Sequence, residues 1–197
     1  MLSSLDAEAH GFVRRIVRPG DFVVDATAGN GHDTLFLARL VGPGGRVLAF
    51  DVQRDALTVT RGRLEQSGCA ERVRLIHQGH EQLARHLDEW LAAYPGVTAG
   101  MFNLGFLPGG DKSLITRAAT TLAACEALLP YLTDGGLISV HAYTGHEGGQ
   151  HETEALLEWA AQLPWQTWRV RPTGPHNKPK NGERLIVIQR LPARRKP

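Results

Sequence analysis

Acidic, amide, histidine and glycine residues follow five apolar runs of this sequence, and these residue types could bind a cofactor and move a proton. The runs end at or just before Asp25, Asp51, Gln78, Asn103 and His141. If the runs are parallel strands, their ligands bind beyond the carboxyl ends, at one edge of the sheet. Polar residues at five consecutive strand ends therefore predict one functional rim.

The first strand end carries a turn of small residues that precedes an apolar helix pattern. Gly29 and Gly31 can adopt positive φ and let a ligand approach the backbone, and the following helix start offers free N–H groups. Asp51 lies about 20 residues beyond Gly31, a spacing that places an acid near ribose hydroxyls. The sequence favours a nucleotide-type cofactor, although a strand–helix connection could need two glycines for its own geometry. Cofactor contacts are predicted for Asp25, Thr27, Gly29, Asn30, Gly31, Asp33, Thr34, Asp51, Gln53, Gly79 and His80.

Enzymes that use NAD and enzymes that use S-adenosylmethionine share this arrangement. The dinucleotide fingerprint requires a third small residue three places after the second glycine, where this chain has Thr34. The pattern from Asp25 to Gly31, an acid-x-small-x-Gly-x-Gly, resembles the first motif of class I methyltransferases. We therefore expect S-adenosylmethionine, and an NAD-dependent oxidoreductase stays as an alternative.

The composition is that of an ordinary globular protein. The chain has 197 residues, of which 42% are hydrophobic and 21% charged, enough to bury a sizeable core. We find no apolar run of membrane-spanning length and no signal-peptide pattern, so we expect a cytoplasmic protein without membrane contact. Two cysteines are too few for a disulfide framework or a cysteine metal site, and a net charge of +2 neither requires nor excludes nucleic acid.

Alternating strand and helix patterns predict an α/β, doubly wound, Rossmann-like fold of the class I methyltransferase type. The predicted sheet is mostly parallel and seven-stranded, and its last two strands form an antiparallel hairpin because no helix separates them. The chain, residues 1–197, is expected to be one domain with a lead helix at about 5–18 and a basic tail at about 191–197. Further helices are predicted at about 33–41, 54–66, 80–91, 115–132 and 152–163, and strands at 21–25, 46–51, 73–77, 97–103, 137–143, 165–171 and 184–190.

The segment after the fourth strand is the most informative, because this strand lies at the reaction centre in such a layout. Amino-group methyltransferases often place Asn or Asp there, followed by Pro-Pro-aromatic. This chain has Asn103, but Leu104-Gly105-Phe106 replaces the rest. The Asn103 carbonyl could accept a hydrogen bond from a target amine, or Asn103 and Gly105 could simply shape a tight turn. Catalytic roles are predicted for Asn103, His141 and Tyr143.

Other polar and aromatic residues on the rim predict contacts to RNA. Phe106 can stack on an unpaired base, and the Gly109–Lys112 segment can form an anion-binding nest or cap a helix. Lysines in the segment 172–182 can neutralise phosphates, unless this is a solvated loop stiffened by prolines. Substrate contacts are predicted for Phe106, Gly109, Asp111, Lys112, His146, His176, Asn177 and Lys178. We predict no metal site, because His141, His146 and His151 have no supporting carboxylate or cysteine pattern.

Four segments of the chain together resemble the bacterial putative rRNA methylase family. They are Asp25–Thr34, Asn103–Lys112, the pattern His141-x-Tyr143-x-Gly145-His146-x-Gly148-Gly149, and Asn177-Lys178-Pro179. The resemblance runs from about residue 23 to 188, and the second segment is its most specific motif. Lys180 stands where the family tends to carry a second proline.

The resemblance implies a methyl transfer from S-adenosylmethionine to the primary amine of 5-aminomethyl(-2-thio)uridine at the tRNA wobble position. It also implies contact with the tRNA anticodon arm and a homodimer. In this reaction Asn103 would orient the amine, and His141 or Tyr143 would hold the base or relay the proton. An rRNA methyltransferase of the same fold and a non-catalytic module that binds S-adenosylmethionine and RNA remain alternatives.

Overall fold

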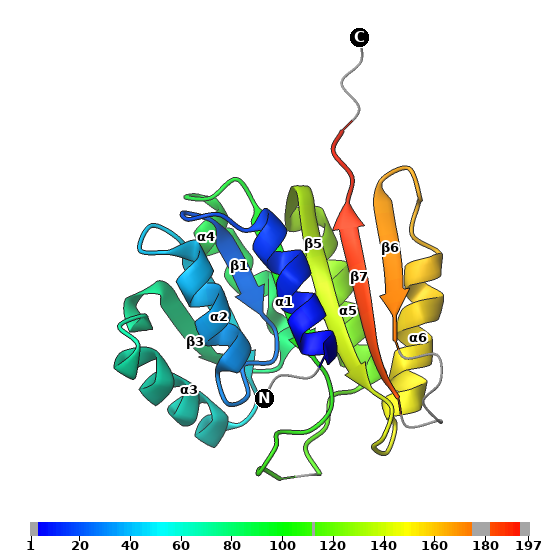
Figure 1. Cartoon of the computed structure of the whole chain (residues 1–197), viewed down its shortest axis with the longest axis horizontal. Helices are drawn as coiled ribbons and strands as arrows, with labels where there is room; N and C mark the ends of the chain where they lie inside the picture. Colours follow the sequence, from blue (N-terminus) through cyan, green and yellow to red (C-terminus); the bar gives the residue numbers. More distant parts are fainter. Residues whose placement is uncertain (1–3, 112, 175–181, 194–197) are drawn as a thin grey trace.

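Seven strands form one sheet in the order β3-β2-β1-β4-β5-β7-β6 (Figure 1). The computed structural model describes residues 4–111, 113–174 and 182–193. The pairs among β1 to β5 are parallel, whereas β7 pairs antiparallel with both β5 and β6. The strands are β1 (Phe22–Asp25), β2 (Arg46–Asp51), β3 (Val73–His77), β4 (Val97–Asn103), β5 (Leu132–Tyr143), β6 (Trp168–Thr173) and β7 (Glu183–Arg190).

Helices cover both faces of the sheet, and each face has its own apolar core. Buried residues of α1, α2 and α3 pack with Val23 of β1 in one core, whereas those of α4, α5 and α6 pack with Phe22 and Val24 in the other. Figure 1 shows α1 and α2 in front of the sheet and α5 behind it. The helices are α1 (Ser4–Ile16), α2 (His32–Val41), α3 (Arg54–Gln66), α4 (Ala84–Leu91), α5 (Ala118–Leu128) and α6 (Gly149–Ala161), with 3-10 turns η1 (Ala70–Arg72), η2 (His80–Gln82) and η3 (Leu129–Tyr131).

The central strands are apolar on both faces because both faces are covered, as is typical of parallel sheets. All four residues of β1 are buried. Their side chains alternate between the two cores, so the strand reads as a continuous apolar run that ends in Asp25. The predicted doubly wound fold and its C-terminal antiparallel hairpin are confirmed.

The register of the sheet brings the predicted site residues together at one edge. Asn103 of β4 is the partner of His141 of β5, and Tyr143 of β5 is the partner of Glu183 of β7. The parallel strands all end at this edge, where the segment between β4 and α5 also lies (Figure 1). The strand ends predicted to form the rim therefore lie at one edge of the sheet.

Several predicted element boundaries differ from those in the structure, and three of the differences have a local structural basis. The helix predicted to reach residue 132 ends at Leu128, because Pro130 cannot donate the next helical hydrogen bond, and η3 follows. The strand predicted at 137–143 begins earlier, at Leu132, and contains an irregularity where the register with β4 shifts and Gly135 has a φ of 81°. The strand predicted from Trp165 begins at Trp168, because the Trp168 N–H closes a turn onto the Pro164 carbonyl at 2.9 Å.

Candidate active site

The glycine loop after β1 has the backbone conformation that its sequence predicts. Gly29 has a φ of 52° and Gly31 a φ of 78°. A Cβ on Gly31 would lie 2.8 Å from Oγ1 of Thr60 and 2.9 Å from its Cα, so only glycine fits against α3. From that helix Thr60 Oγ1 donates to the Gly29 carbonyl and Arg63 Nε donates to the Asn30 carbonyl, both at 2.8 Å. The sequence did not predict these two hydrogen bonds, because the local pattern of α3 does not indicate contact with the loop.

Asp51 closes the loop from the end of β2. Its Oδ2 accepts the Gly29 N–H at 2.8 Å, and its Oδ1 accepts the Gln53 N–H at 2.8 Å. A carboxylate oxygen can accept more than one hydrogen bond. Asp51 can therefore hold the loop and still bind a ligand hydroxyl.

Asp25 lies beneath the loop and is only 1% exposed. Its oxygens accept the Thr34 hydroxyl at 2.6 Å and the Thr27 N–H at 3.1 Å. Burial, reinforced by the negative charge of Asp33, raises the pKa of Asp25 to about 7. Asp25 and Thr34 thus form the floor of the loop.

The lead helix contributes to the same region, which its sequence did not predict. Nε2 of His10 lies 2.7 Å from Oδ1 of Asp33, and the His10 ring stacks on Phe36 with 3.7 Å between centroids. Helix α1 is thereby attached to the start of α2.

His80 forms one wall of the end of the site where the cofactor is predicted to bind. Its Nδ1 lies 3.2 Å from the Ala26 carbonyl, and its ring packs edge-on against Phe102. Burial lowers the pKa of His80, although nearby carboxylates oppose this shift. The imidazole is therefore neutral at physiological pH. Because a carbonyl oxygen can only accept, the contact with Ala26 requires the proton on Nδ1.

The end of β4 is bonded to the cofactor loop. The Asn103 N–H donates to Oγ1 of Thr27 at 2.7 Å, and Nδ2 of Asn30 donates to the Pro108 carbonyl at 3.3 Å. The predicted cofactor side and the predicted substrate side of the site therefore share hydrogen bonds.

Phe106 and His146 form the opposite wall of the rim. Phe106 is 40% exposed, and its ring meets that of His146 edge-on at 6.2 Å between centroids. Nδ1 of His146 lies 2.9 Å from the Glu147 carbonyl, whereas its buried Nε2 has no hydrogen-bond partner among the described residues. Phe106 thus presents an aromatic ring at the mouth of the site.

Two carboxylates flank His141, which is 3% exposed. Its Nδ1 lies 2.6 Å from Oδ1 of Asp6 on α1. Its Nε2 lies 3.3 Å from Oε2 of Glu183 on β7, within ion-pair distance but out of line for a hydrogen bond. The Tyr143 ring stacks on His141 at 4.4 Å, and its hydroxyl lies 3.4 Å from Nδ1. Burial and the charges of Asp6, Glu183 and Asp33 raise the pKa of Tyr143, which therefore stays protonated.

These walls enclose a cavity of about 1160 Å³. Predicted site residues that line it are Thr27, Gly29, Asn30, Asp33, Asp51, Gln53, Gly79, His80, Asn103, Phe106, Tyr143 and His146. The cavity is also lined by Asp6 and Glu183, which sequence reasoning missed because α1 and β7 carry no motif around them. The lining does not include Asp25, Gly31, Thr34, Gly109, Asp111 or His141.

The predicted substrate residues Lys112, His176, Asn177 and Lys178 lie outside the described residues. Asp111 is exposed, and its side chain accepts hydrogen bonds from the Ser113 N–H and hydroxyl at 2.8 and 2.7 Å. These bonds lower the pKa of Asp111. Asp111 thus shapes its own turn.

Among residues 4–111, 113–174 and 182–193, no group of three or more His, Cys, Asp and Glu side chains could hold a metal ion. Within the same residues, no helix combines the length and the apolar character that a bilayer crossing needs.

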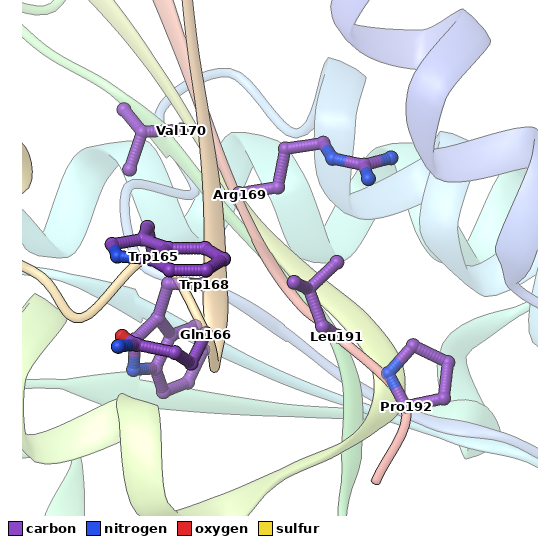
Figure 2. A pocket seen from close by; sticks show the side chains of 7 residues that line it. All are labelled: Trp165, Gln166, Trp168, Arg169, Val170, Leu191 and Pro192. Carbon is purple, nitrogen blue, oxygen red and sulfur yellow. The ribbon is translucent and has the colours of Figure 1, made fainter. Parts of the chain in front are cut away.

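A second hollow of about 660 Å³ lies where β6 begins and β7 ends, and no predicted site residue lines it. Figure 2 shows Trp165 and Trp168 on one side of β6 and Arg169 on the other. Trp165 is 73% exposed. Since Trp168 pairs with Arg190, this hollow is at the end of the hairpin remote from the cavity.

The strand order, the glycine loop and the acid at the end of β2 define a class I methyltransferase fold. Two solved structures match it along nearly the whole chain. A putative rRNA methylase from Clostridium thermocellum is 37% identical with a TM-score of 0.88, covering 97% of this chain and 100% of its own. A putative methyltransferase from Streptococcus mutans was solved in complex with SAH, S-adenosylhomocysteine. It is 34% identical with a TM-score of 0.84, and the match covers 97% of this chain and 100% of that one.

The chain belongs to the family described as Putative rRNA methylase, whose model matches residues 47–189. A curated relative from Arabidopsis thaliana, the chloroplastic tRNA (mnm(5)s(2)U34)-methyltransferase, is 40% identical over 168 residues. The match covers 81% of this chain and 60% of that relative, so the chain spans less than two thirds of its length. The family resemblance found in the sequence is confirmed.

Proposed function

We propose that this protein methylates the primary amine of 5-aminomethyl(-2-thio)uridine at the tRNA wobble position, with S-adenosylmethionine as the methyl donor. The observation that carries the proposal is the acidic wall of the cavity. Asp6 and Glu183 line it on either side of His141, and Asn103 pairs with His141 in the sheet. Carboxylates beside an amide carbonyl suit a cationic amine.

The other half of the cavity fits the cofactor. The glycine loop brings backbone close to the cavity without a Cβ on Gly31, and Asp51 lines the cavity beside it. Asp51 would accept hydrogen bonds from the ribose hydroxyls, as an acid at the end of the second strand does in related folds. When bound, S-adenosylmethionine supplies a methyl group on a positively charged sulfur. The SAH bound to the Streptococcus mutans relative supports this assignment.

The acidic wall would bind the cationic substrate, but it also favours the ammonium form, so the proton must leave before the methyl group is transferred. An alkyl amine has a pKa near that of lysine, about 10.4, and its ammonium form has no lone pair to attack with. The carboxylates of Asp6 and Glu183 would attract the ammonium, and its released proton would pass to this wall or to water. The amine nitrogen then forms a bond to the methyl carbon while the carbon–sulfur bond breaks.

The remaining residues would position the amine. The Asn103 carbonyl would accept an N–H and direct the lone pair toward the methyl group, because alignment supplies much of the rate. Tyr143 stays protonated, so it would serve as a hydrogen-bond donor rather than as a base. His141 would act through the carboxylates, since it does not line the cavity. Phe106, at the mouth, would stack on the unpaired base.

Charge in the cavity favours this substrate over the alternatives. An rRNA methyltransferase that acts on a ring atom has no cation to neutralise, and a non-catalytic module has no need of a buried imidazole between two carboxylates that line a cavity. The name of the Arabidopsis relative supports the same amine substrate. Within this proposal the protein is a cytoplasmic single-domain chain that acts as a homodimer on the anticodon arm.

The test of the acidic wall uses the variants Asp6→Asn and Glu183→Gln with tRNA that carries the aminomethyl nucleoside. Each should raise KM for tRNA or lower kcat by about tenfold, the scale of a lost charge-assisted hydrogen bond. SAH affinity should stay the same. Glu147→Gln, at an exposed carboxylate near the rim, is the matched control. Wild-type kinetics in both variants would show that Asp6 and Glu183 do not act on the substrate amine.

In cells, deletion of the gene should cause loss of the methylaminomethyl nucleoside and accumulation of its unmethylated amine. Mass spectrometry of digested tRNA measures both. Unchanged tRNA together with an undermethylated rRNA nucleoside would favour the rRNA alternative.

A further inference from the structure

Glu152, in the first turn of α6, carries a carboxylate that is 2% exposed and does not line the cavity. Charged side chains are seldom buried so deeply without partners. Its Oε2 accepts the Thr116 hydroxyl at 2.8 Å and its Oε1 accepts the Thr121 hydroxyl at 2.6 Å. The start of α6 adds favourable dipole charge for a carboxylate. Each carboxylate oxygen of Glu152 therefore has a hydroxyl donor.

The first of these bonds leads directly to the substrate side of the site. Oγ1 of Thr116 accepts the Gly105 N–H at 2.9 Å, and the Thr116 N–H donates to the Gly105 carbonyl at 3.0 Å. Phe106 and Ile115 form the adjacent β-bridge. Glu152 thus holds the base of the segment that joins β4 to α5.

A carboxylate fixes the direction of this chain of bonds. It can only accept, so the Thr116 hydroxyl must donate to Glu152 and present its lone pairs to Gly105. An amide at position 152 could donate instead and leave the hydroxyl proton free to turn. The carboxylate therefore sets the direction of the Thr116 hydroxyl as well as packing between α5 and α6.

The second bond ends within the protein interior. Oγ1 of Thr121 lies 3.5 Å from Nε2 of His80. Thr121 gives its proton to Glu152, and the neutral His80 carries its proton on Nδ1, so this contact is packing and not a hydrogen bond. The hydrogen bonds of Glu152 therefore lead to the substrate side of the site through Thr116.

We infer that Glu152 is a positioning residue that sets the geometry of Asn103 and Phe106 through Thr116 and Gly105. The inference rests on the proposed function, because methyl transfer is its readout. It assigns Glu152 no contact with the substrate. Loss of the carboxylate should shift the amine-orienting carbonyl away from its aligned position and slow the chemical step, whereas Asp51 and the glycine loop are unaffected.

The experiment compares Glu152→Gln and Thr116→Val with two controls in the full-length protein. Glu154→Gln changes an exposed carboxylate on the same helix, and Thr116→Ser keeps the hydroxyl. Single-turnover methyl transfer at saturating S-adenosylmethionine should fall at least about tenfold in the first two variants, since small misplacements carry such penalties. SAH affinity should stay within about threefold, and both controls should match the wild type. The double variant should be no slower than the slower single variant, because both changes break one path.

Hydrogen exchange of the SAH-bound protein separates this inference from the proposed function. Peptides that contain Gly105 should exchange faster in Glu152→Gln than in Glu154→Gln, whichever RNA is the substrate. If the wild type methylates no aminomethyl tRNA but this exchange difference is present, the proposed function fails and the positioning role stands. Unchanged exchange, additive losses in the double variant, or losses that follow SAH affinity would overturn the inference.

Discussion

The Gly29 N–H donates to Oδ2 of Asp51 at 2.8 Å, so the end of β2 fixes the loop that follows β1. These residues are 22 positions apart in the chain and meet because β1 and β2 are parallel neighbours. The acid predicted to bind ribose is therefore also part of the loop's own structure. Cofactor affinity and loop geometry should depend on the same carboxylate.

Asp51→Ala should weaken SAH binding about 10- to 100-fold, because it removes hydrogen bonds to a charged acceptor on both loop and ligand. Isothermal titration calorimetry measures the change directly. Asp55→Asn, at an exposed acid in the first turn of α3, should bind SAH like the wild type. An Asp51→Ala protein with unaltered affinity would show that the ribose lies elsewhere.

Gly31→Ala should destabilise the protein by about 1–3 kcal/mol, since the new Cβ would collide with Thr60 in a backbone conformation that alanine rarely adopts. The matched change is Gly62→Ala in the interior of α3, where nothing lies within 4 Å of the added atom. That change should stabilise the protein by about 0.5–1 kcal/mol. Urea denaturation compares the two, and equal effects would refute the steric argument.

The fold, the glycine loop and the position of Asp51 beside it were predictable because their signals are local. Alternating apolar runs and helical stripes give the strands and helices, and the spacing from Gly31 to Asp51 follows from one βαβ unit. Asp51 and the two glycines could be identified without knowledge of the rest of the chain.

The acidic wall was not predictable for the opposite reason. Asp6 and His141 are 135 positions apart, and neither α1 nor β7 has a pattern that identifies an inward carboxylate. The sequence around Glu152 does not distinguish it from any other acid in the first turn of a helix, so its burial could not be predicted. His141 was predicted to be a catalytic residue, and the structure buries it behind Asp6 and Glu183, a position that depends on how α1 packs on β5.

Asp25 should make stability depend on pH in a defined direction. Its pKa is about 7 in the folded protein and about 3.9 when unfolded. Between these values the folded state holds a proton that the unfolded state has released. Its stabilising contribution is therefore complete below about pH 4 and is lost as the pH rises through 7, by roughly 4 kcal/mol in total.

The test is Asp25→Asn, which cannot titrate and keeps an acceptor for the Thr27 N–H. The free energy of unfolding of this variant, relative to wild type, should rise between about pH 4 and 7 and then level off. Urea denaturation of both proteins across that range gives the difference. Parallel curves for the two proteins would mean that the pKa of Asp25 is not raised.

Asn103→Ala should reduce turnover about 100-fold while SAH affinity changes little, because the side chain would act on the amine and not on the cofactor. The backbone bond from Asn103 to Thr27 does not depend on the side chain, so the fold should persist. Rapid-quench kinetics together with calorimetry separate the two effects. Normal turnover in this variant would remove Asn103 from the mechanism.

The central claim is that the reacting atom is the amine of an aminomethyl uridine at the wobble position. The most direct measurement incubates the purified protein with S-adenosylmethionine and tRNA that carries 5-aminomethyl-2-thiouridine, followed by nucleoside mass spectrometry. The account predicts conversion to 5-methylaminomethyl-2-thiouridine, with the added methyl on the side-chain nitrogen. A tRNA that remains unmethylated, or a methyl group found on any other atom, would contradict it.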